Sequence, residues 1–146
     1  MDEKLTRWIW ASITKFIDSK RQSIQLILEG DDVLIQNKDS FTLRINGPIY
    51  TEPSKDYFVI DVGINVLVTS IKDEADAHKV FRLCGIISRA YENQISVYKY
   101  GDDNSFVGCL IRQDKIIITQ FGAVEASTNV LQSTVESEYK MQLKGA

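Results

Sequence analysis

The feature of this chain that most limits its possible folds is a strict alternation of residue types over residues 57–69. Apolar side chains occupy every even position from Phe58 to Val68, whereas Asp61 and Asn65 lie at odd positions. This period of two predicts a β-strand with one buried face, because successive side chains of a strand point to opposite faces of the sheet. A strand of this length extends about 43 Å at about 3.3 Å per residue, whereas a domain of this size is only about 30–35 Å across. Part of the strand should therefore protrude or be covered by another molecule, and the first candidate is a second copy of the chain.

Chain length and composition predict one globular domain, residues 1–146. Of the 146 residues, 44% are hydrophobic and 25% are charged, which suits a single unit with its own core. The formal net charge is −3, so there is no basic excess to bind nucleic acid. No apolar run is long enough to span a membrane, and the first residues lack the order of a signal peptide. We expect a soluble protein made in the cytoplasm, with Cys84 and Cys109 as reduced thiols.

Two amphipathic helices are predicted, one at the N-terminus and one near the middle of the chain. Apolar residues recur at helical spacing in residues 4–21, and Trp8 and Trp10 lie on opposite shoulders of that apolar stripe. Either both tryptophans widen the contact with the core, or they anchor a partner. The second helix can be capped by Asp73 and runs to about residue 91. Its predicted apolar stripe consists of Ala77, Val80, Phe81, Cys84, Ile87 and Tyr91.

The remaining predicted elements are strands with short connections, which favour antiparallel pairing. One strand of residues 41–45 ends at Gly47-Pro48, because proline cannot donate to a central ladder. A polar loop of residues 50–56 then leads into the long strand, and a hairpin turn is expected at residues 113–114. The other expected strands are residues 23–29, 95–100, 106–112, 116–121 and 130–143, with a possible short strand at 33–36. The fold class is therefore α+β: a mostly antiparallel sheet with unusually long strands, on which an N-terminal helix and a central helix pack.

The sequence contains no recognisable catalytic constellation. His78 is the only histidine, and no cysteine or carboxylate stands near it at metal-ligand spacing. There is no glycine-rich phosphate loop and no nucleophile elbow. We therefore expect no enzymatic activity, no cofactor and no metal.

Two weaker signals have a structural and a functional interpretation. The pairs Asp31-Asp32 and Asp102-Asp103 each follow a glycine, as in a solvated turn, although carboxylates can also bind divalent cations. Aromatic side chains on a sheet can stack nucleobases, but those of the strands after the second helix lack interleaved arginines, which favours packing. These aromatic residues are Tyr98, Tyr100 and Phe106.

Four segments give the chain a resemblance to phage tail terminator proteins, also called tail completion proteins, and to related small neck proteins. The resemblance is one of residue pattern and element order, covers nearly the whole chain and assigns no individual site residue. The segments are Leu5-Thr-Arg-Trp-Ile-Trp-Ala-Ser-Ile, Tyr57-Phe-Val-Ile-Asp-Val-Gly-Ile-Asn-Val-Leu-Val-Thr, Ala77-His-Lys-Val-Phe-Arg-Leu-Cys-Gly-Ile-Ile and Val130-Leu-Gln-Ser-Thr-Val-Glu-Ser-Glu-Tyr.

The resemblance implies a structural virion protein that forms a ring, commonly a homohexamer, at the head-proximal end of a tail. Such a ring ends tube polymerisation and joins the tail to the head connector. The implied partners are further copies of the chain, a tail tube protein and a connector or stopper protein. DNA would only pass through the lumen, and no membrane is involved. The implied location is the tail or neck of the virion, and the host cytoplasm during assembly.

Two alternatives remain open at this point. One is another neck, tube or baseplate ring component, and the other is a small non-viral ligand-binding or regulatory α+β domain. A ring closes when two unlike surfaces of each subunit meet around an axis, so an interface is expected in either ring-forming case. Polar loops at residues 30–40 and 50–56 are candidates to clamp a neighbour. The candidate interface residues are Trp8, Trp10, Asp31, Asp32, Lys38, Asp39, Glu52 and Lys55.

Overall fold

The computed structural model describes residues 3–28, 38–54, 56–71, 78–113, 115–123 and 130–144. Two helices and one sheet of seven strands make an α+β fold, as the sequence predicts. The elements are α1 (Glu3–Lys20), β1 (Gln25–Leu28), β2 (Ser40–Ser54), β3 (Tyr57–Ile71), α2 (Lys79–Ala90), β4 (Gln94–Tyr98), β5 (Phe106–Arg112), β6 (Ile117–Ala123) and β7 (Val130–Lys144).

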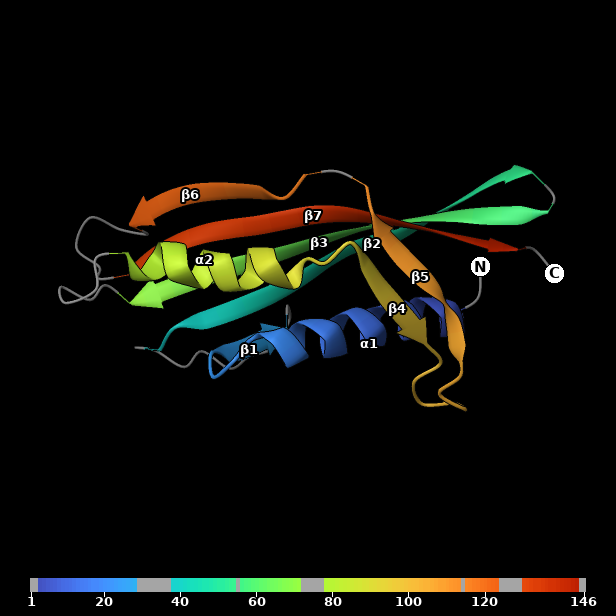
Figure 1. Ribbon diagram of the computed structural model, residues 1–146, viewed down its shortest axis with the longest axis horizontal. Coiled ribbons are helices and arrows are strands. Elements are labelled where there is room, and N and C mark those ends of the chain that lie inside the picture. Colours follow the sequence, from blue (N-terminus) through green and yellow to red (C-terminus); the bar gives the residue numbers. More distant parts are fainter. Residues whose placement is uncertain are drawn as a thin grey trace.

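The sheet has the strand order β1-β2-β3-β7-β5-β4, and β6 also pairs with β7. The central strand β3 pairs antiparallel with β2 and with β7, and all three of these strands have 15 residues. β1 instead pairs parallel with β2. The sheet curls around the helices, and β4 and β5 cross α1 at a steep angle (Figure 1).

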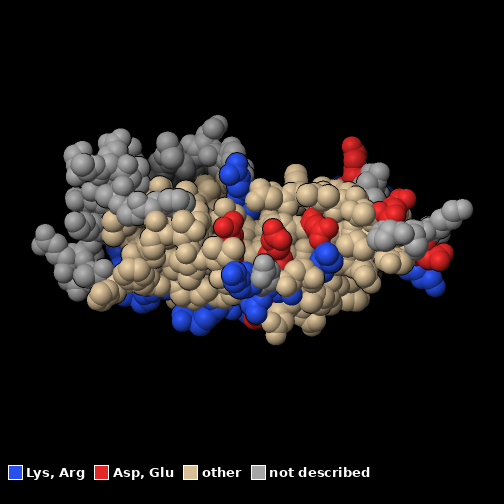
Figure 2. Space-filling model, turned by 90° about the horizontal axis from the view of Figure 1, so that it is seen from above, with Lys and Arg blue, Asp and Glu red and all other residues tan. Residues whose placement is uncertain are grey.

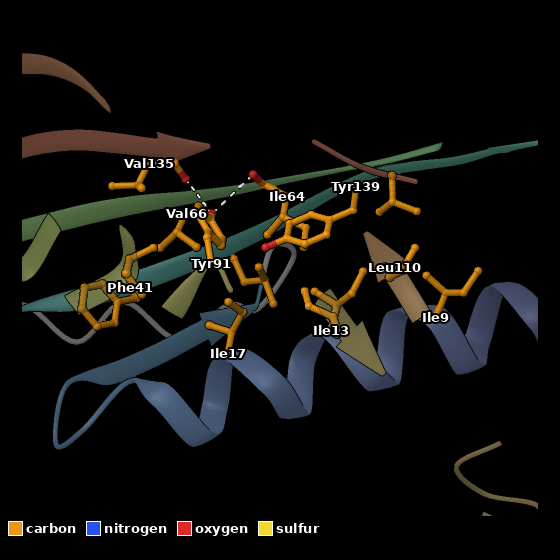
Figure 3. Close-up of a cluster of buried hydrophobic side chains, with 14 of the residues drawn as sticks. Ile9, Ile13, Ile17, Phe41, Ile64, Val66, Tyr91, Leu110, Val135 and Tyr139 are labelled. Atoms are coloured by element: carbon orange, nitrogen blue, oxygen red, sulfur yellow. Dashed lines mark hydrogen bonds between the residues drawn. The ribbon is translucent and has the colours of Figure 1, made fainter. Parts of the chain in front are cut away.

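The core lies between one face of β3 and the two helices. The predicted buried face is confirmed from Ile60 to Val68, whose even positions are at most 2% exposed, whereas Phe58, also expected there, is only partly buried. Ile9 and Ile17 of α1 point toward the buried side chains of the sheet and are fully buried (Figure 3). The spacing of the α1 apolar residues, one helical turn apart, places them on the face that packs on the sheet.

Tyr91 connects the end of α2 to the two central strands. Its hydroxyl donates to the carbonyl oxygen of Val135 at 2.7 Å and to that of Ile64 at 3.3 Å (Figure 3). The hydroxyl of Tyr139 donates to the carbonyl oxygen of Glu92 at 2.8 Å. Burial raises the pKa of Tyr91 well above its usual value and raises the pKa of Tyr139 to about 12. Both phenols are therefore structural groups held in the neutral form.

The predicted end of a strand at Gly47-Pro48 is wrong, and so is the predicted loop at residues 50–56. β2 continues to Ser54 and pairs with β3 again at Ile49 opposite Asp61. A bulge between Asn46 and Ile49 accommodates Gly47, whose φ is 99°. Proline is tolerated there because this part of β2 is an edge, where an N–H group is not needed for a ladder.

The predicted hairpin between β5 and β6 is also wrong. Both strands pair with β7, one after the other along its length: Ile111 lies opposite Lys140, and Ile117 lies opposite Glu136. The turn at residue 113 therefore does not reverse the chain onto β5. It passes the chain from one half of β7 to the other half.

The second helix begins at Lys79 in the structure, later than the predicted cap at Asp73. Asp73 and Ala77 lie outside the described residues, as do residues 33–36. Phe81 was expected in the buried stripe but is 55% exposed, which corrects that prediction. The buried positions of α2 are Val80, Leu83, Cys84, Ile86, Ile87 and Ala90.

Candidate functional site

The most unusual surface of the molecule is a β-arm, which we define as residues 49–54 of β2, 57–59 of β3 and 142–144 of β7. Its tip, where Ser54 pairs with Tyr57, extends beyond both helices (Figure 1), whereas Tyr50 at its base lies beside α1 and shares a hydrogen bond of 2.6 Å with Thr6. Two large apolar side chains of the arm face solvent, because Ile49 is 64% exposed and Tyr57 is 37% exposed. This end of the sheet therefore carries apolar surface that the described residues leave exposed.

The two tryptophans lie on opposite sides of α1, as the helical stripe predicts. Trp8 is partly buried: its Nε1 donates to Asp102 at 2.7 Å, and the Lys99 ammonium lies 5.3 Å from its ring centre. Trp10 is 47% exposed, and its Nε1 donates to the carbonyl oxygen of Gly47 at 3.0 Å. The chain therefore uses Trp8 to hold the β4–β5 turn, whereas half of Trp10 remains available beside the edge of β2.

The predicted charged interface residues fall into two groups. Lys38 and Glu52 are exposed, and Glu52 belongs to the arm. Asp39 is engaged within the chain: it accepts from the N–H of Ile71 at 2.9 Å and pairs with Lys79 at 3.2 Å. Asp31, Asp32 and Lys55 lie outside the described residues.

Replacing Asp39 with alanine is expected to lower the free energy of unfolding by about 1–3 kcal/mol. Its carboxylate ties the start of β2 to the end of β3 and the start of α2, and hydrogen bonds to charged groups are worth about 1.5–3 kcal/mol. Urea unfolding followed by circular dichroism measures the change. Lys38→Ala is the matched control, since an exposed substitution usually changes stability by at most about 0.5 kcal/mol. Equal stability of the two variants would contradict the structural role of Asp39.

The face of the sheet opposite the helices is polar and carries charges of both signs. A groove of about 570 Å³ lies along β3 and β7, where Asp61 and Lys140 approach to 3.6 Å. Glu136 and Glu138 line the same groove, and Gly63 leaves part of its floor without a side chain. Seen from above, acidic side chains gather near the middle of the molecule with lysine or arginine beside them (Figure 2). This mixture of charges does not select for one sign of ligand.

The outer edge of β6 is a second surface that sequence reasoning missed. In the described part of the chain β6 pairs with β7 alone, and Ile117 and Ile118 are 43% and 46% exposed. The signal was present in the sequence, because none of the seven residues from Ile117 to Ala123 is charged. The expected hairpin pairs this strand with residues 106–112, whereas in the structure it pairs with β7.

The described residues contain no group of three metal-ligating side chains. His78 lies at the N-terminal cap of α2, is exposed, and its ring centre is 6.1 Å from that of Phe81. Tyr98 packs against Tyr100 and Phe106, with ring centres 5.8 Å apart in both pairs. Among the helices described, none is long and apolar enough to cross a membrane. The features that call for a functional explanation are therefore the arm and the strand edges.

Comparison with known protein families gives no match, and comparison with curated proteins gives none either.

Proposed function

We propose that this chain is a structural virion protein, which assembles into a ring at the head-proximal end of a phage tail. In this position the ring ends polymerisation of the tail tube and joins the tail to the head connector. The proposal rests on the β-arm: three strands of 15 residues in a mostly antiparallel sheet leave Ile49 and Tyr57 in solvent. Exposed apolar surface on a protruding element is typical of a contact with another subunit.

The chemistry of the remaining surface supports an assembly role. Aromatic anchors and strand edges recur in protein interfaces, and Trp10 lies beside the edge of β2 that leads into the arm. The net charge of −3, and the charges of both signs on the face of the sheet opposite the helices, suit a channel that DNA must cross without binding. The same surface would serve any ring of a neck or tail, so the experiment must test position as well as assembly.

The test combines mass with tube capping. A ring should appear in native mass spectrometry as a multiple of 16.6 kDa near six, either alone or after mixing with purified tail tubes. Added during polymerisation of the tube protein, the chain should shorten the tubes, and electron microscopy should show a ring at one end. A chain that stays monomeric with tubes present and leaves tube length unchanged would contradict the proposal. Rings that bind no tube end would favour a different neck or baseplate position.

A matched pair of arm variants makes the test specific. Ile49→Lys places a charge at the most exposed apolar side chain of the arm and should abolish ring formation. Phe81→Lys changes a similarly exposed apolar residue on α2, away from the arm, and should leave rings intact. Loss of assembly in both variants would show that the arm has no special role.

Trp10 should become protected from solvent when the ring forms. In the single subunit it is 47% exposed, so its fluorescence should be quenched efficiently by acrylamide. The variant Trp8→Phe leaves Trp10 as the only tryptophan, and its quenching constant should fall on assembly. Trp10→Phe provides the control, because Trp8 is already partly buried against the β4–β5 turn. An unchanged quenching constant for Trp10 would place it outside the interface.

A further inference from the structure

Among the described residues, the edge of β6 lacks the features that normally keep strands from pairing with other chains. Natural sheets protect their edges with charged residues, prolines, bulges or covering elements. β6 has neither a charge nor a proline, and its single bulge, between Gln120 and Gly122, comes near its end. Ile117 and Ile118 add exposed apolar surface at the start of the strand. An edge of this kind is suited to accept another strand.

Two other edges of the sheet are protected. Along β2 beyond Leu43, Pro48 and the bulges interrupt the edge, and Trp10 bonds to the carbonyl oxygen of Gly47. β4 packs against α1, where Ser12 bonds to both the N–H and the carbonyl oxygen of Tyr98. Neither edge offers a continuous row of groups to a neighbour.

A further edge belongs to β1, whose residues Gln-Leu-Ile-Leu are also uncharged. In the described part of the chain β2 is the only strand that pairs with it. A groove of about 430 Å³ separates β1 from α1, and its lining includes Gln25. The amide oxygen of Gln25 is buried and accepts no hydrogen bond from the described residues, which is costly unless a donor comes from elsewhere.

The directions of the strands make these two edges compatible in a head-to-tail contact. β1 is parallel to β2, and each following neighbour in the run β1-β2-β3-β7-β6 is antiparallel to the one before. β6 therefore runs antiparallel to β1, and a second copy in the same orientation presents its β1 antiparallel to β6. The faces agree as well. Ile27 lies opposite Thr42 and Ile117 lies opposite Glu136, so both isoleucines belong to the face away from the helices.

We infer that the subunits of the ring join by sheet extension: the β6 edge of one copy pairs antiparallel with the β1 edge of the next. This inference rests on the proposed ring and names one pair of surfaces that joins neighbouring subunits, in addition to the contact proposed for the β-arm. The contact is between unlike edges, as a closed ring requires. The absence of charge on both edges means that no ion loses its hydration when the strands pair.

Cysteine cross-linking distinguishes the possible contacts. In a background of Cys84→Ala and Cys109→Ser, the double variant Ile27→Cys, Ile117→Cys treated with a short bismaleimide should give a ladder of oligomers. A mixture of the two single variants should give dimers only, and either single variant alone should give none. Cross-linking of Ile117→Cys alone would overturn the inference, because it would reveal a two-fold contact between β6 strands. A control with Thr51→Cys on the arm in place of Ile27→Cys should give no ladder.

A charge substitution provides an independent readout. Ile118→Lys should abolish ring formation, whereas Ile111→Lys, at a side chain of similar exposure on β5, should leave it intact. Circular dichroism and thermal melting verify that both variants fold. Rings seen by native mass spectrometry that do not cross-link between β1 and β6, or that tolerate Ile118→Lys, would overturn the inference and leave the proposed ring standing. A complete ladder of cross-linked oligomers from a chain that never caps tail tubes would support the contact between β1 and β6 and contradict the tail function.

Discussion

Replacing Ile64 with alanine is expected to lower the free energy of unfolding by about 2–5 kcal/mol. Ile64 is 1% exposed at the middle of β3, where it faces both helices. Removing its side-chain carbons loses their burial and leaves a cavity that the central strand cannot close by moving, because β2 and β7 hold it on both sides. Urea unfolding of the isolated subunit measures the effect.

The neighbouring polar face supplies the control for this experiment. Thr42→Ala changes a partly exposed side chain on the other side of the same sheet and should cost less than about 1 kcal/mol. The difference in unfolding free energy between the two variants depends on strand register, because a shift of one residue would exchange the two faces of the sheet. A cost of less than about 1 kcal/mol for Ile64→Ala would contradict the register described here.

The protein should lose stability steeply above about pH 10 because of two buried tyrosines. Burial raises the pKa of Tyr91 and raises that of Tyr139 to about 12, whereas the unfolded chain releases these protons near pH 10. Above pH 10 the folded state therefore binds more protons than the unfolded state, and the free energy of unfolding falls as the pH rises. Each tyrosine contributes up to about 1.4 kcal/mol per pH unit until its folded pKa is reached. Below pH 10 the contribution is constant.

Urea midpoints measured from pH 8 to pH 11.5 test this dependence. Tyr139→Phe removes one titrating group, so its stability should fall less steeply with pH than that of the unaltered protein. A slope that Tyr139→Phe does not reduce would show that other groups cause the loss of stability at high pH.

The sequence predicts most of the elements, because their signals are local. The alternation in β3 and β7 and the helical spacing in α1 each lie within one segment, and the structure has these elements within a few residues of the expected bounds. The exceptions depend on neighbours. Pro48 ends a strand only if that strand is paired on both sides, and the position of β2 at an edge is a property of the whole sheet. The same holds for β6, which pairs with β7 rather than with the strand before the preceding turn.

The candidate site shows a similar division. Trp8 and Trp10 were found from their place on the helical stripe, which a single segment determines. Asp39 was expected at the rim of a contact, but its nearest partners belong to β3 and α2, which are distant in sequence. Ile117 and Ile118 have the exposure of interface residues because no strand of the described chain covers their edge. The local residue pattern of an edge strand with exposed apolar residues is the same as that of a buried strand, so only the sheet order distinguishes them.

The position of β7 at the end of the sequence affects how the chain folds during its synthesis on the ribosome. β7 follows every other strand in the chain, yet it pairs with β3, β5 and β6. While these strands emerge, β3 can form its hairpin with β2, but its other side stays without its native partner until residues 130–144 are synthesised. The nascent chain therefore exposes a long apolar strand for much of its translation, which is the condition under which chaperones bind and sheets mispair. A slow codon or a fused domain placed just before Val130 should prolong that interval and raise the fraction of chains lost to aggregation.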